Sequence, residues 1–210
     1  MKKGLFITFE GGEGTGKTTQ IKNLAGWLKK KRRPFLITRE PGGTVFADQI
    51  RSLLLDPKNK GMDRHLELLL YLIARQDHVT QKIRPALKKG KVVLCDRFTD
   101  ATLAYQGYGR GLSVQWLKRL NDVATGGLKP DLTFLFDIPI SVGLGRARNH
   151  HSRQGQDRFE REKNLFHQKV RRGYLTLARQ EKKRFRIVDT RRPKPEVSKK
   201  LIRYLQEVLR

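Results

Sequence analysis

The sequence predicts an α/β fold, in which a five-stranded parallel sheet is flanked by helices on both faces. Short, nearly continuous apolar runs alternate along the chain with segments whose apolar residues recur at helical spacing. A glycine-rich stretch joins the first apolar run to the first helical segment. The 210 residues suit one domain, so we expect residues 1–210 to form a single unit with a short mobile lid.

The expected elements follow from these patterns in chain order. Apolar and β-prone runs predict strands at residues 5–10, 35–38, 92–96, 132–137 and 185–189. Helical spacing, as in Ile21, Leu24 and Leu28, predicts helices at about residues 21–28, 46–54, 63–87, 116–124, 159–181 and 196–209. In such sheets ligands bind beyond the carboxyl ends of the strands, so the residues at those ends decide the chemistry.

Composition excludes several classes of protein. The single cysteine, Cys95, rules out a disulfide framework, and no apolar run approaches the roughly 18 residues of a membrane span. We therefore expect a cytoplasmic protein without a membrane partner. The chain has 46 Lys and Arg against 20 Asp and Glu, a net charge of +26, which attracts polyanions. Its basic clusters are spread along the chain and hold few aromatic residues, so we interpret them as solvated helix faces and expect no nucleic-acid partner.

The glycine-rich stretch is a nucleotide-binding motif. Residues 11–19 read Gly-Gly-Glu-Gly-Thr-Gly-Lys-Thr-Thr, which fits G-x-x-x-x-G-K-[ST] between a strand and a helix and predicts a P-loop NTPase fold. Lys17 can reach the β- and γ-phosphates of ATP, and the Thr18 hydroxyl can bind Mg²⁺. The backbone N–H groups that would surround the phosphates belong to Gly11, Gly12, Glu13, Gly14, Thr15 and Gly16. The motif alone does not distinguish a kinase from a motor, a GTPase or a transporter ATPase.

A second signal stands at the end of the third predicted strand. This strand ends in Asp96, whose carboxylate would lie beside the P-loop and hold Mg²⁺ directly or through water. Arg97 follows at once and can lie against the transferred phosphate. We therefore predict catalytic roles for Lys17, Asp96 and Arg97, with Mg²⁺ as cofactor between Thr18 and Asp96. The structural alternative is an ordinary ion pair at the end of a strand.

Several further stretches match one family in order and over essentially the whole chain. They include Thr-Arg-Glu-Pro-Gly-Gly-Thr at residues 38–44, Asp-Arg-Phe at 96–98, Ala-Tyr-Gln-Gly at 104–107 and Asp-Arg-Phe-Glu at 157–160. With the P-loop, they make the chain resemble the thymidylate kinases of bacteria. The resemblance implies a homodimer that transfers the γ-phosphoryl group of ATP to dTMP, giving dTDP. The family can also carry a cis peptide bond at Glu40–Pro41; an ordinary turn proline is the alternative.

The resemblance also implies an acceptor site. In the family, the residue at Glu13 faces the 3′-hydroxyl of the deoxyribose, and the residue at Tyr105 packs on the sugar and excludes a 2′-hydroxyl. The residue at Tyr71 stacks on thymine, one helical turn from the arginine that binds the base. The dTMP-binding residues implied in this way are Glu13, Arg51, Tyr71, Arg75, Arg97, Thr102, Tyr105 and Gln106.

The donor site is expected to include the arginine-rich lid, at about residues 143–160. The variable positions of the P-loop hold no arginine, and family members of this type supply the catalytic arginine from the lid. We choose Arg153 for this role, with Arg158 as the second candidate. Arg146 in the lid and Thr190 after the last strand complete the expected ATP site. The structural alternative for the lid is an exposed basic loop.

Three other functions remain to be weighed. Another nucleoside-monophosphate kinase is the nearest rival, and only the family match at Arg75, Thr102 and Tyr105 favours thymidylate. A polynucleotide-binding P-loop ATPase is the alternative of a different class, and it predicts a basic stripe with interleaved aromatic residues. A P-loop switch or scaffold would leave the acceptor-site residues unexplained.

Overall fold

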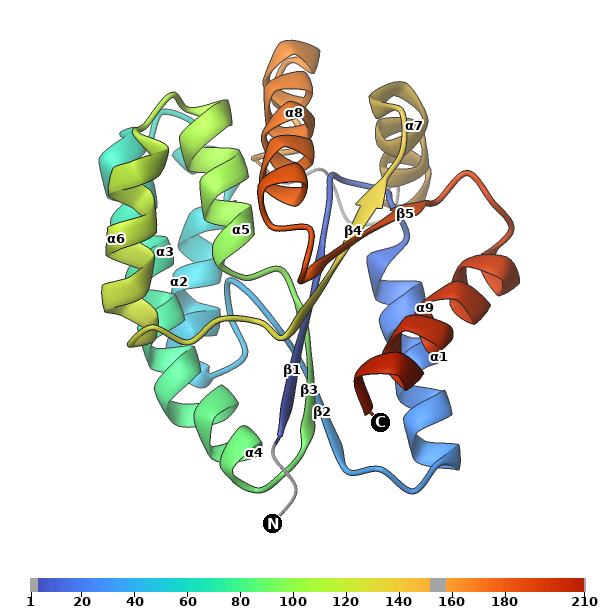
Figure 1. Ribbon diagram of the computed structural model, residues 1–210. Coiled ribbons are helices and arrows are strands. Elements are labelled where there is room, and N and C mark those ends of the chain that lie inside the picture. The colour runs from blue at the N-terminus through green and yellow to red at the C-terminus, as the bar shows by residue number, and fades with distance from the viewer. Residues whose placement is uncertain (1–3, 152–157, 210) are drawn as a thin grey trace.

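The computed structural model describes residues 4–151 and 158–209 (Figure 1). In this part of the chain five strands form a parallel sheet in the order β2-β3-β1-β4-β5. The predicted fold class is confirmed, because the sheet has helices on both faces. Every predicted strand boundary lies within one residue of the observed one. The strands are β1 (Leu5–Glu10), β2 (Phe35–Arg39), β3 (Val92–Asp96), β4 (Leu132–Asp137) and β5 (Phe185–Asp189).

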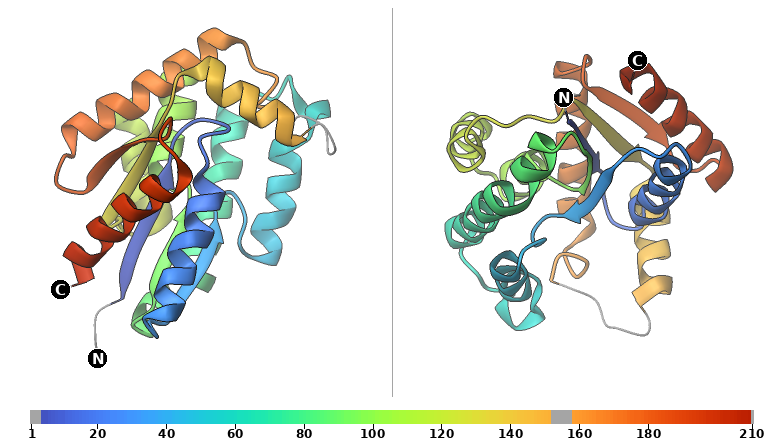
Figure 2. Two further views of the ribbon diagram at one scale, coloured as in Figure 1. Left: turned by 90° about the vertical axis from the view of Figure 1, so that its right-hand side faces the viewer. Right: turned by 90° about the horizontal axis from the view of Figure 1, so that it is seen from below.

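One face of the sheet is covered by α1 (Lys17–Lys30) and α9 (Lys194–Leu209), which lie side by side (Figures 1 and 2). Alternate residues of the strands point to this face, among them Phe9 and Phe134, and pack against the apolar stripes of both helices. The basic tract after residue 28 ends α1 with Lys29 and Lys30 in its last turn, where cations complement the helix dipole, as expected.

The opposite face carries the larger group of helices. These elements are α2 (Val45–Leu55), α3 (Arg64–His78), α4 (Arg84–Lys88), α5 (Thr99–Thr102), α6 (Val114–Thr125), α8 (Asn164–Gln180), the short 3₁₀ helix η1 (Pro57–Asn59) and two π-helical turns, η2 (Val79–Ile83) and η3 (Leu103–Gly109). Several of them pack around a second core in which Phe159, Phe166 and Tyr174 meet the apolar side chains of the strands and helices, while η2 and α4 contribute to one smaller cluster and α2 and α3 to another. Helix α7 (Ile140–His151) stands beyond the carboxyl end of β4 (Figure 1).

Two helices differ from the sequence prediction. The helix expected over residues 63–87 is divided into α3, η2 and α4. Pro85 has no N–H to donate and its ring crowds the preceding turn, so the wider π-helical turn directly before it accommodates the proline. The helix expected from residue 159 begins at Asn164, because residues 158–162 form turns.

The segment predicted to be a lid is partly helical. Helix α7 covers residues 140–151, including the first part of the 143–160 segment. Residues 152–157, and with them Arg153, lie outside the described residues. Among the residues that the structure describes, no helix is long and apolar enough to cross a membrane.

Candidate active site

The loop between β1 and α1 wraps tightly at the carboxyl end of the sheet. Gly11 and Gly14 have φ angles of 134° and 63°. A Cβ atom would lie 2.3 Å from the carbonyl oxygen of Phe136 at Gly11 and 2.0 Å from that of Gly143 at Gly14. Glycine is therefore required at both positions. The loop consequently packs against the end of β4 and against α7, and the other predicted phosphate-binding residues stand in it: Gly12, Glu13, Thr15 and Gly16.

The side chain of Lys17 lies over this loop. Its Nζ donates to the carbonyl oxygens of Gly11 at 3.2 Å and Gly12 at 2.9 Å. Burial lowers the pKa of Lys17, and the charge of Arg97 lowers it further, while Asp96 acts in the opposite direction. The ammonium group therefore stands where the P-loop pattern predicts contact with the phosphates of a nucleotide.

Thr18 and Asp96 meet at the start of α1. The Thr18 hydroxyl donates to Asp96 Oδ2 at 3.5 Å, and the Thr18 residue is exposed. A hydroxyl and a carboxylate are hard oxygen ligands, which fit Mg²⁺. No group of three or more His, Cys, Asp and Glu side chains that could hold a metal ion occurs within residues 4–151 and 158–209. The protein thus offers two oxygens here, and phosphate and water would supply the others.

Arg97 links the P-loop to the neighbouring cavity. Its backbone has a φ angle of 67°, which is uncommon for a residue with a side chain. Its Nη1 donates to the Gly11 carbonyl at 2.7 Å, and its Nη2 donates to Glu13 Oε1 at 2.6 Å. The Tyr105 hydroxyl donates to the same carboxylate oxygen at 2.9 Å. Arg97 therefore contacts both the backbone of the P-loop and the Glu13 carboxylate, which faces the cavity.

Glu13 is ionised in this arrangement. Burial pushes the pKa of its carboxyl upward, but the charges of Arg97 and Lys17 and the hydrogen bond from Tyr105 outweigh burial and lower the pKa to about 2. The Arg97 guanidinium also lies over the Tyr105 ring, 5.1 Å from its centroid. The carboxylate of the P-loop is thus held between an arginine and a tyrosine at the wall of the cavity.

The cavity gathers every residue that the resemblance assigned to the acceptor nucleotide. Its lining includes Glu13, Arg51, Tyr71, Arg75, Arg97, Thr102, Tyr105 and Gln106. These side chains come from the P-loop, α2, α3, α5, η3 and the residue after β3. The structure thus brings together residues that are dispersed along the sequence, directly beside the P-loop.

Arg75 is buried and is held by neighbours on all sides. Its Nε donates to Glu40 Oε2 at 2.7 Å, and its Nη1 donates to Thr102 Oγ1 at 2.9 Å and to Asn121 Oδ1 at 2.6 Å. Its Nη2 donates to the Phe98 carbonyl oxygen at 3.1 Å. The Glu40 carboxylate therefore compensates the buried positive charge at the edge of the cavity.

Arg51, Tyr71 and Gln106 also line the cavity. Arg51 on α2 donates from Nη1 to the Pro41 carbonyl oxygen at 2.9 Å, and the Glu40–Pro41 peptide bond is cis. Tyr71 on α3 is half-buried, and burial raises the pKa of its hydroxyl, so the hydroxyl stays protonated. Gln106 on η3 donates to Glu67 Oε1 at 2.8 Å.

Sequence reasoning missed Glu67, on which three side chains converge. Besides Gln106, Arg110 lies 3.3 Å and Arg158 2.8 Å from Glu67 Oε2. Arg158 is only 1% exposed and also donates from Nε to the Leu54 carbonyl oxygen. This second candidate for the lid arginine is therefore a buried ion-pair partner beside the acceptor cavity. The spacing Glu67-Tyr71-Arg75, four residues apart on one helix face, was the signal that could have revealed Glu67.

Phe159 was part of a matched motif, but sequence reasoning gave it no role. Its ring lines the cavity and lies edge-on to Tyr71 and Tyr105, with ring centroids 6.4 Å and 5.7 Å away. Such aromatic contacts are favourable and restrict the rings they join. Phe159 thus forms an apolar wall next to the tyrosine predicted to stack on the base.

Two of the predicted donor-side residues, Arg146 and Thr190, differ in their exposure. Arg146 on α7 is exposed and donates from Nη1 to the Thr190 carbonyl oxygen at 3.2 Å. Thr190 is buried, and its N–H donates to the Asp137 carbonyl oxygen at 3.1 Å. The two residues predicted to flank ATP therefore contact each other beside the end of β4.

Comparisons with known proteins agree on one family. A sequence model of the thymidylate kinase family matches residues 9–201. The thymidylate kinase of Desulfosudis oleivorans is 50% identical over 208 residues, with 97% of both chains covered, and that of Geotalea daltonii is 58% identical over 190 residues, with 89% of both covered. A crystal structure of thymidylate kinase from Ehrlichia chaffeensis superposes with a TM-score of 0.77 at 33% identity, over 97% of this chain and 99% of that one. The chain belongs to the thymidylate kinase family.

Proposed function

We propose that the chain transfers the γ-phosphoryl group of ATP to dTMP and forms dTDP, a step in the synthesis of dTTP. Membership of the thymidylate kinase family makes it a nucleotide kinase, a transferase of nucleotide biosynthesis. The observation that carries the proposal is the cavity beside the P-loop that is lined by all eight predicted acceptor residues. A polynucleotide-binding ATPase is not favoured, because its only support is the net charge of +26.

The acceptor phosphate needs little activation. The second pKa of a phosphate monoester is about 6, so most dTMP is already dianionic at neutral pH. The attacking group is an oxygen of this dianion, and no general base is required. Arg51 and Arg97, which both line the cavity, hold the acceptor phosphate in line with the γ-phosphate of ATP. The rate gain comes from alignment and from stabilisation of charge.

Bringing two polyanions together requires compensating positive charge. Lys17 approaches from the P-loop, where its Nζ at present donates to backbone carbonyl oxygens that ATP phosphates would replace as partners. Arg97 stands between the P-loop and the acceptor cavity. Arg153 supplies a further positive charge from the lid at about residues 143–160, and Arg146 and Thr190 flank ATP. Charges fixed in advance of the reaction stabilise the transition state most effectively.

Mg²⁺ accompanies ATP in this proposal. Thr18 and Asp96 would hold it, and their side-chain oxygens lie 3.5 Å apart beside the P-loop. When bound, the ion neutralises charge on the phosphates.

Glu13 and Tyr105 select the sugar. The ionised Glu13 carboxylate accepts a hydrogen bond from the 3′-hydroxyl of the deoxyribose, in the position where it now accepts from Arg97 and Tyr105. The Tyr105 ring, fixed by Arg97 and Phe159, occupies the space that a 2′-hydroxyl would need. A ribonucleotide is therefore a poorer acceptor.

A second copy of the chain covers the outer face of α2, α3 and α6. These three helices lie on one side of the molecule (Figure 1) and leave large apolar side chains exposed. On α3, Leu66, Leu69 and Ile73 are 50%, 53% and 46% exposed and lie on one helix face. Phe46, Leu53 and Trp116 extend this surface on α2 and α6: they are 50%, 53% and 42% exposed. Contiguous apolar surface of this kind marks protein interfaces, so we propose a homodimer.

The enzyme acts in the cytoplasm in this proposal, where ATP and dTMP are available. The buried thiol of Cys95, a residue without a disulfide partner, fits a reducing compartment.

The assay that tests the function measures ADP release from ATP and Mg²⁺ with a panel of nucleoside monophosphates. We expect dTMP to give much the highest kcat/KM. The Lys17→Ala variant, purified in the same way, is the control for contaminating kinases. Equal activity with AMP or GMP would overturn the assignment to dTMP. ATP hydrolysis that polynucleotide stimulates without any monophosphate would instead favour the alternative function.

A further inference from the structure

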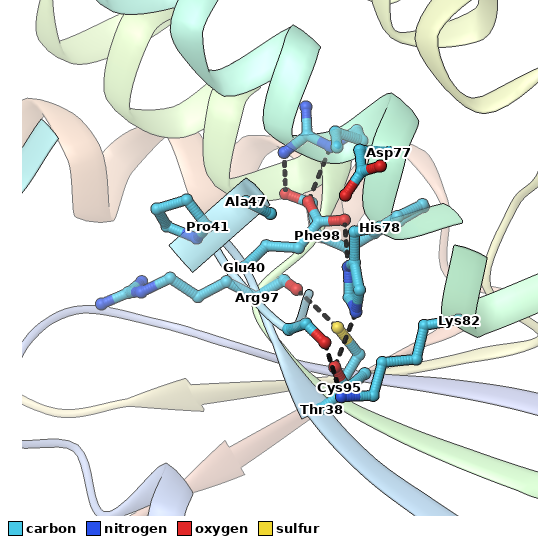
Figure 3. Close-up of polar contacts among 12 residues, drawn as sticks. Thr38, Glu40, Pro41, Ala47, Asp77, His78, Lys82, Cys95, Arg97 and Phe98 are labelled. Atoms are coloured by element: carbon cyan, nitrogen blue, oxygen red, sulfur yellow. Dashed lines mark hydrogen bonds and ion pairs between the residues drawn. The ribbon is translucent and has the colours of Figure 1, made fainter. Parts of the chain in front are cut away.

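A buried polar chain runs from the edge strand β2 to Arg75. His78 Nε2 lies 2.6 Å from Thr38 Oγ1, and His78 Nδ1 lies 3.0 Å from Glu40 Oε1 (Figure 3). The other oxygen of Glu40 accepts from Arg75 Nε at 2.7 Å. The side chains of His78, Glu40 and Arg75 are 0%, 3% and 1% exposed. The chain is thus shielded from water, and each member depends on its neighbour for a hydrogen-bond partner.

The direction of the hydrogen bond between His78 and Glu40 follows from the charge on Glu40. Burial pushes the pKa of its carboxyl upward, but Arg75 and His78 outweigh burial and lower it, so Glu40 is ionised. A carboxylate can only accept, and His78 Nδ1 must therefore carry the hydrogen that it shares with Glu40. In a neutral imidazole, Nε2 is then the acceptor and takes the hydrogen of the Thr38 hydroxyl.

Arg75 has five N–H hydrogens, and the protein uses four of them. Glu40, Thr102, Asn121 and the Phe98 carbonyl oxygen each accept one. Within the described parts of the chain, one hydrogen on Nη2 therefore has no acceptor, and Arg75 lines the acceptor cavity. The orientation of the guanidinium plane, which these partners set, determines where this last hydrogen points.

We propose that His78 is a positioning residue for the acceptor nucleotide: it fixes the Glu40 carboxylate, which holds Arg75 with its remaining N–H directed at the base. The inference rests on the proposed function, because it assumes that the cavity binds dTMP. His78 does not itself line the cavity and acts only through Glu40 and Arg75.

A purely structural role for His78 makes a different prediction. The turn at residues 39–44 is tied to α3 and η2 by two further contacts, the hydrogen bond from Thr44 to Asp77 and that from Lys82 Nζ to the Gly43 carbonyl oxygen at 2.5 Å. We expect these contacts to keep the turn in place when His78 is altered. A change at His78 should therefore act on Arg75 specifically and leave the surrounding fold intact.

Two amide variants separate the two hydrogen bonds of His78. In His78→Asn the side-chain amide can take the place of Nδ1–H and still donate to Glu40, whereas in His78→Gln the amide reaches the Nε2 position and leaves Glu40 without this donor. We expect His78→Gln to raise the KM for dTMP about tenfold, the cost of a buried carboxylate that loses one hydrogen bond. His78→Asn should raise it about twofold or less. The KM for ATP and kcat should change less than twofold in both.

A double-mutant cycle identifies the route of the effect. If His78 acts through Arg75, the difference between His78→Gln and His78→Asn disappears in an Arg75→Ala background. Equal effects of the two variants in a wild-type background, or the same difference with and without Arg75, would overturn the inference. Thermal unfolding of each protein verifies that it is folded. A wild-type protein that does not use dTMP would overturn the proposed function together with this inference, whereas a dTMP-active enzyme with equal variants overturns the inference alone.

Discussion

The acceptor and donor sides of the site are built in different ways. On the acceptor side, charged residues of the cavity are already paired within the protein: Arg75 with Glu40 and Arg97 with Glu13. On the donor side, Lys17 donates to backbone carbonyl oxygens of its own loop, and Arg146 is exposed to solvent. The acceptor side is therefore organised before any ligand arrives, whereas the donor side presents charge that a nucleotide would bind.

Two carboxyl groups that are only three residues apart, Glu10 and Glu13, have pKa shifts of opposite sign. Glu13 at the cavity wall has its pKa lowered to about 2 by Arg97 and Lys17 despite burial. Burial raises the pKa of Glu10 to about 8, with the negative charge of Asp100 adding to the shift and Arg97 opposing it. Glu10 accepts from the Phe98 N–H at 2.7 Å and from the Tyr174 hydroxyl at 2.8 Å. Glu13 thus supplies a negative charge to the site, whereas Glu10, at the end of β1, accepts hydrogen bonds that hold Phe98 and Tyr174 in place.

The largest expected effect tests whether the acceptor side is held by buried ion pairs. Glu67→Ala leaves Arg158, which is 1% exposed, without its carboxylate partner, and breaking a buried pair in this way typically costs about 3–5 kcal/mol. We expect the free energy of unfolding in urea to fall by about that amount. Asp189→Ala is the matched control, because its partner Arg191 is 67% exposed, and we expect a loss of less than about 1 kcal/mol. Similar losses in the two variants would show that the buried ion pair stabilises the protein no more than the exposed one does.

The next effect separates the two sides by kinetics. Lys17→Ala should lower kcat about a hundredfold, the loss of about 3 kcal/mol typical of one preorganised charge contact, and change the KM for dTMP less than twofold. Arg51→Ala, on the acceptor side, should mainly raise the KM for dTMP. Steady-state kinetics with each substrate varied in turn would measure both. A Lys17→Ala enzyme with near-normal kcat would remove Lys17 from the chemistry.

How far sequence alone predicts this site depends on the distance between partners. The P-loop, Asp96 and Arg97 could be predicted because a strand, a turn and a helix place them by local rules. The acceptor-site residues were predicted only from the resemblance to thymidylate kinases, and the structure brings them together in one cavity. The pairing of Glu67 with Arg158 could not be predicted, because it depends on how the turn at residues 158–162 packs against α3. For the same reason, the contact of Tyr174 on α8 with Glu10 had no local signal.

A smaller effect concerns the dependence of stability on pH. Folded Glu10 keeps its proton up to about pH 8, whereas an unfolded glutamate releases it near its ordinary pKa of 4.5. Between these values the folded state binds more protons, so the contribution of Glu10 to stability is full below pH 4.5 and is lost as the pH rises. The loss is at most about 1.4 kcal/mol per pH unit, or roughly 2.5 kcal/mol from pH 5.5 to 7.5.

Glu10→Gln isolates this contribution, because the amide resembles the neutral carboxyl group and does not titrate. Urea unfolding of the wild type and of Glu10→Gln at pH 5.5, 6.5 and 7.5 would measure the difference in the free energy of unfolding. We expect the variant to gain stability relative to the wild type as the pH rises. A constant difference across this range would show that Glu10 is already ionised in the folded protein.

The smallest expected effect tests whether every polar group at the acceptor wall contributes. The Tyr71 hydroxyl has no hydrogen-bond partner among residues 4–151 and 158–209, although its ring lies edge-on to Phe159 and lines the cavity. Because burial raises the pKa of this hydroxyl, the group also carries no charge at neutral pH. We expect Tyr71→Phe to keep the ring contact and to change the KM for dTMP less than twofold, which corresponds to under about 0.4 kcal/mol. Tyr71→Ala is the matched comparison: loss of the ring should raise this KM by tenfold or more, since stacking on a base is worth about 1–3 kcal/mol. A large effect of Tyr71→Phe would mean that the hydroxyl contacts dTMP. The acceptor side would then also contain a polar group that gains its hydrogen-bond partner only when the nucleotide binds, as we infer for the donor side.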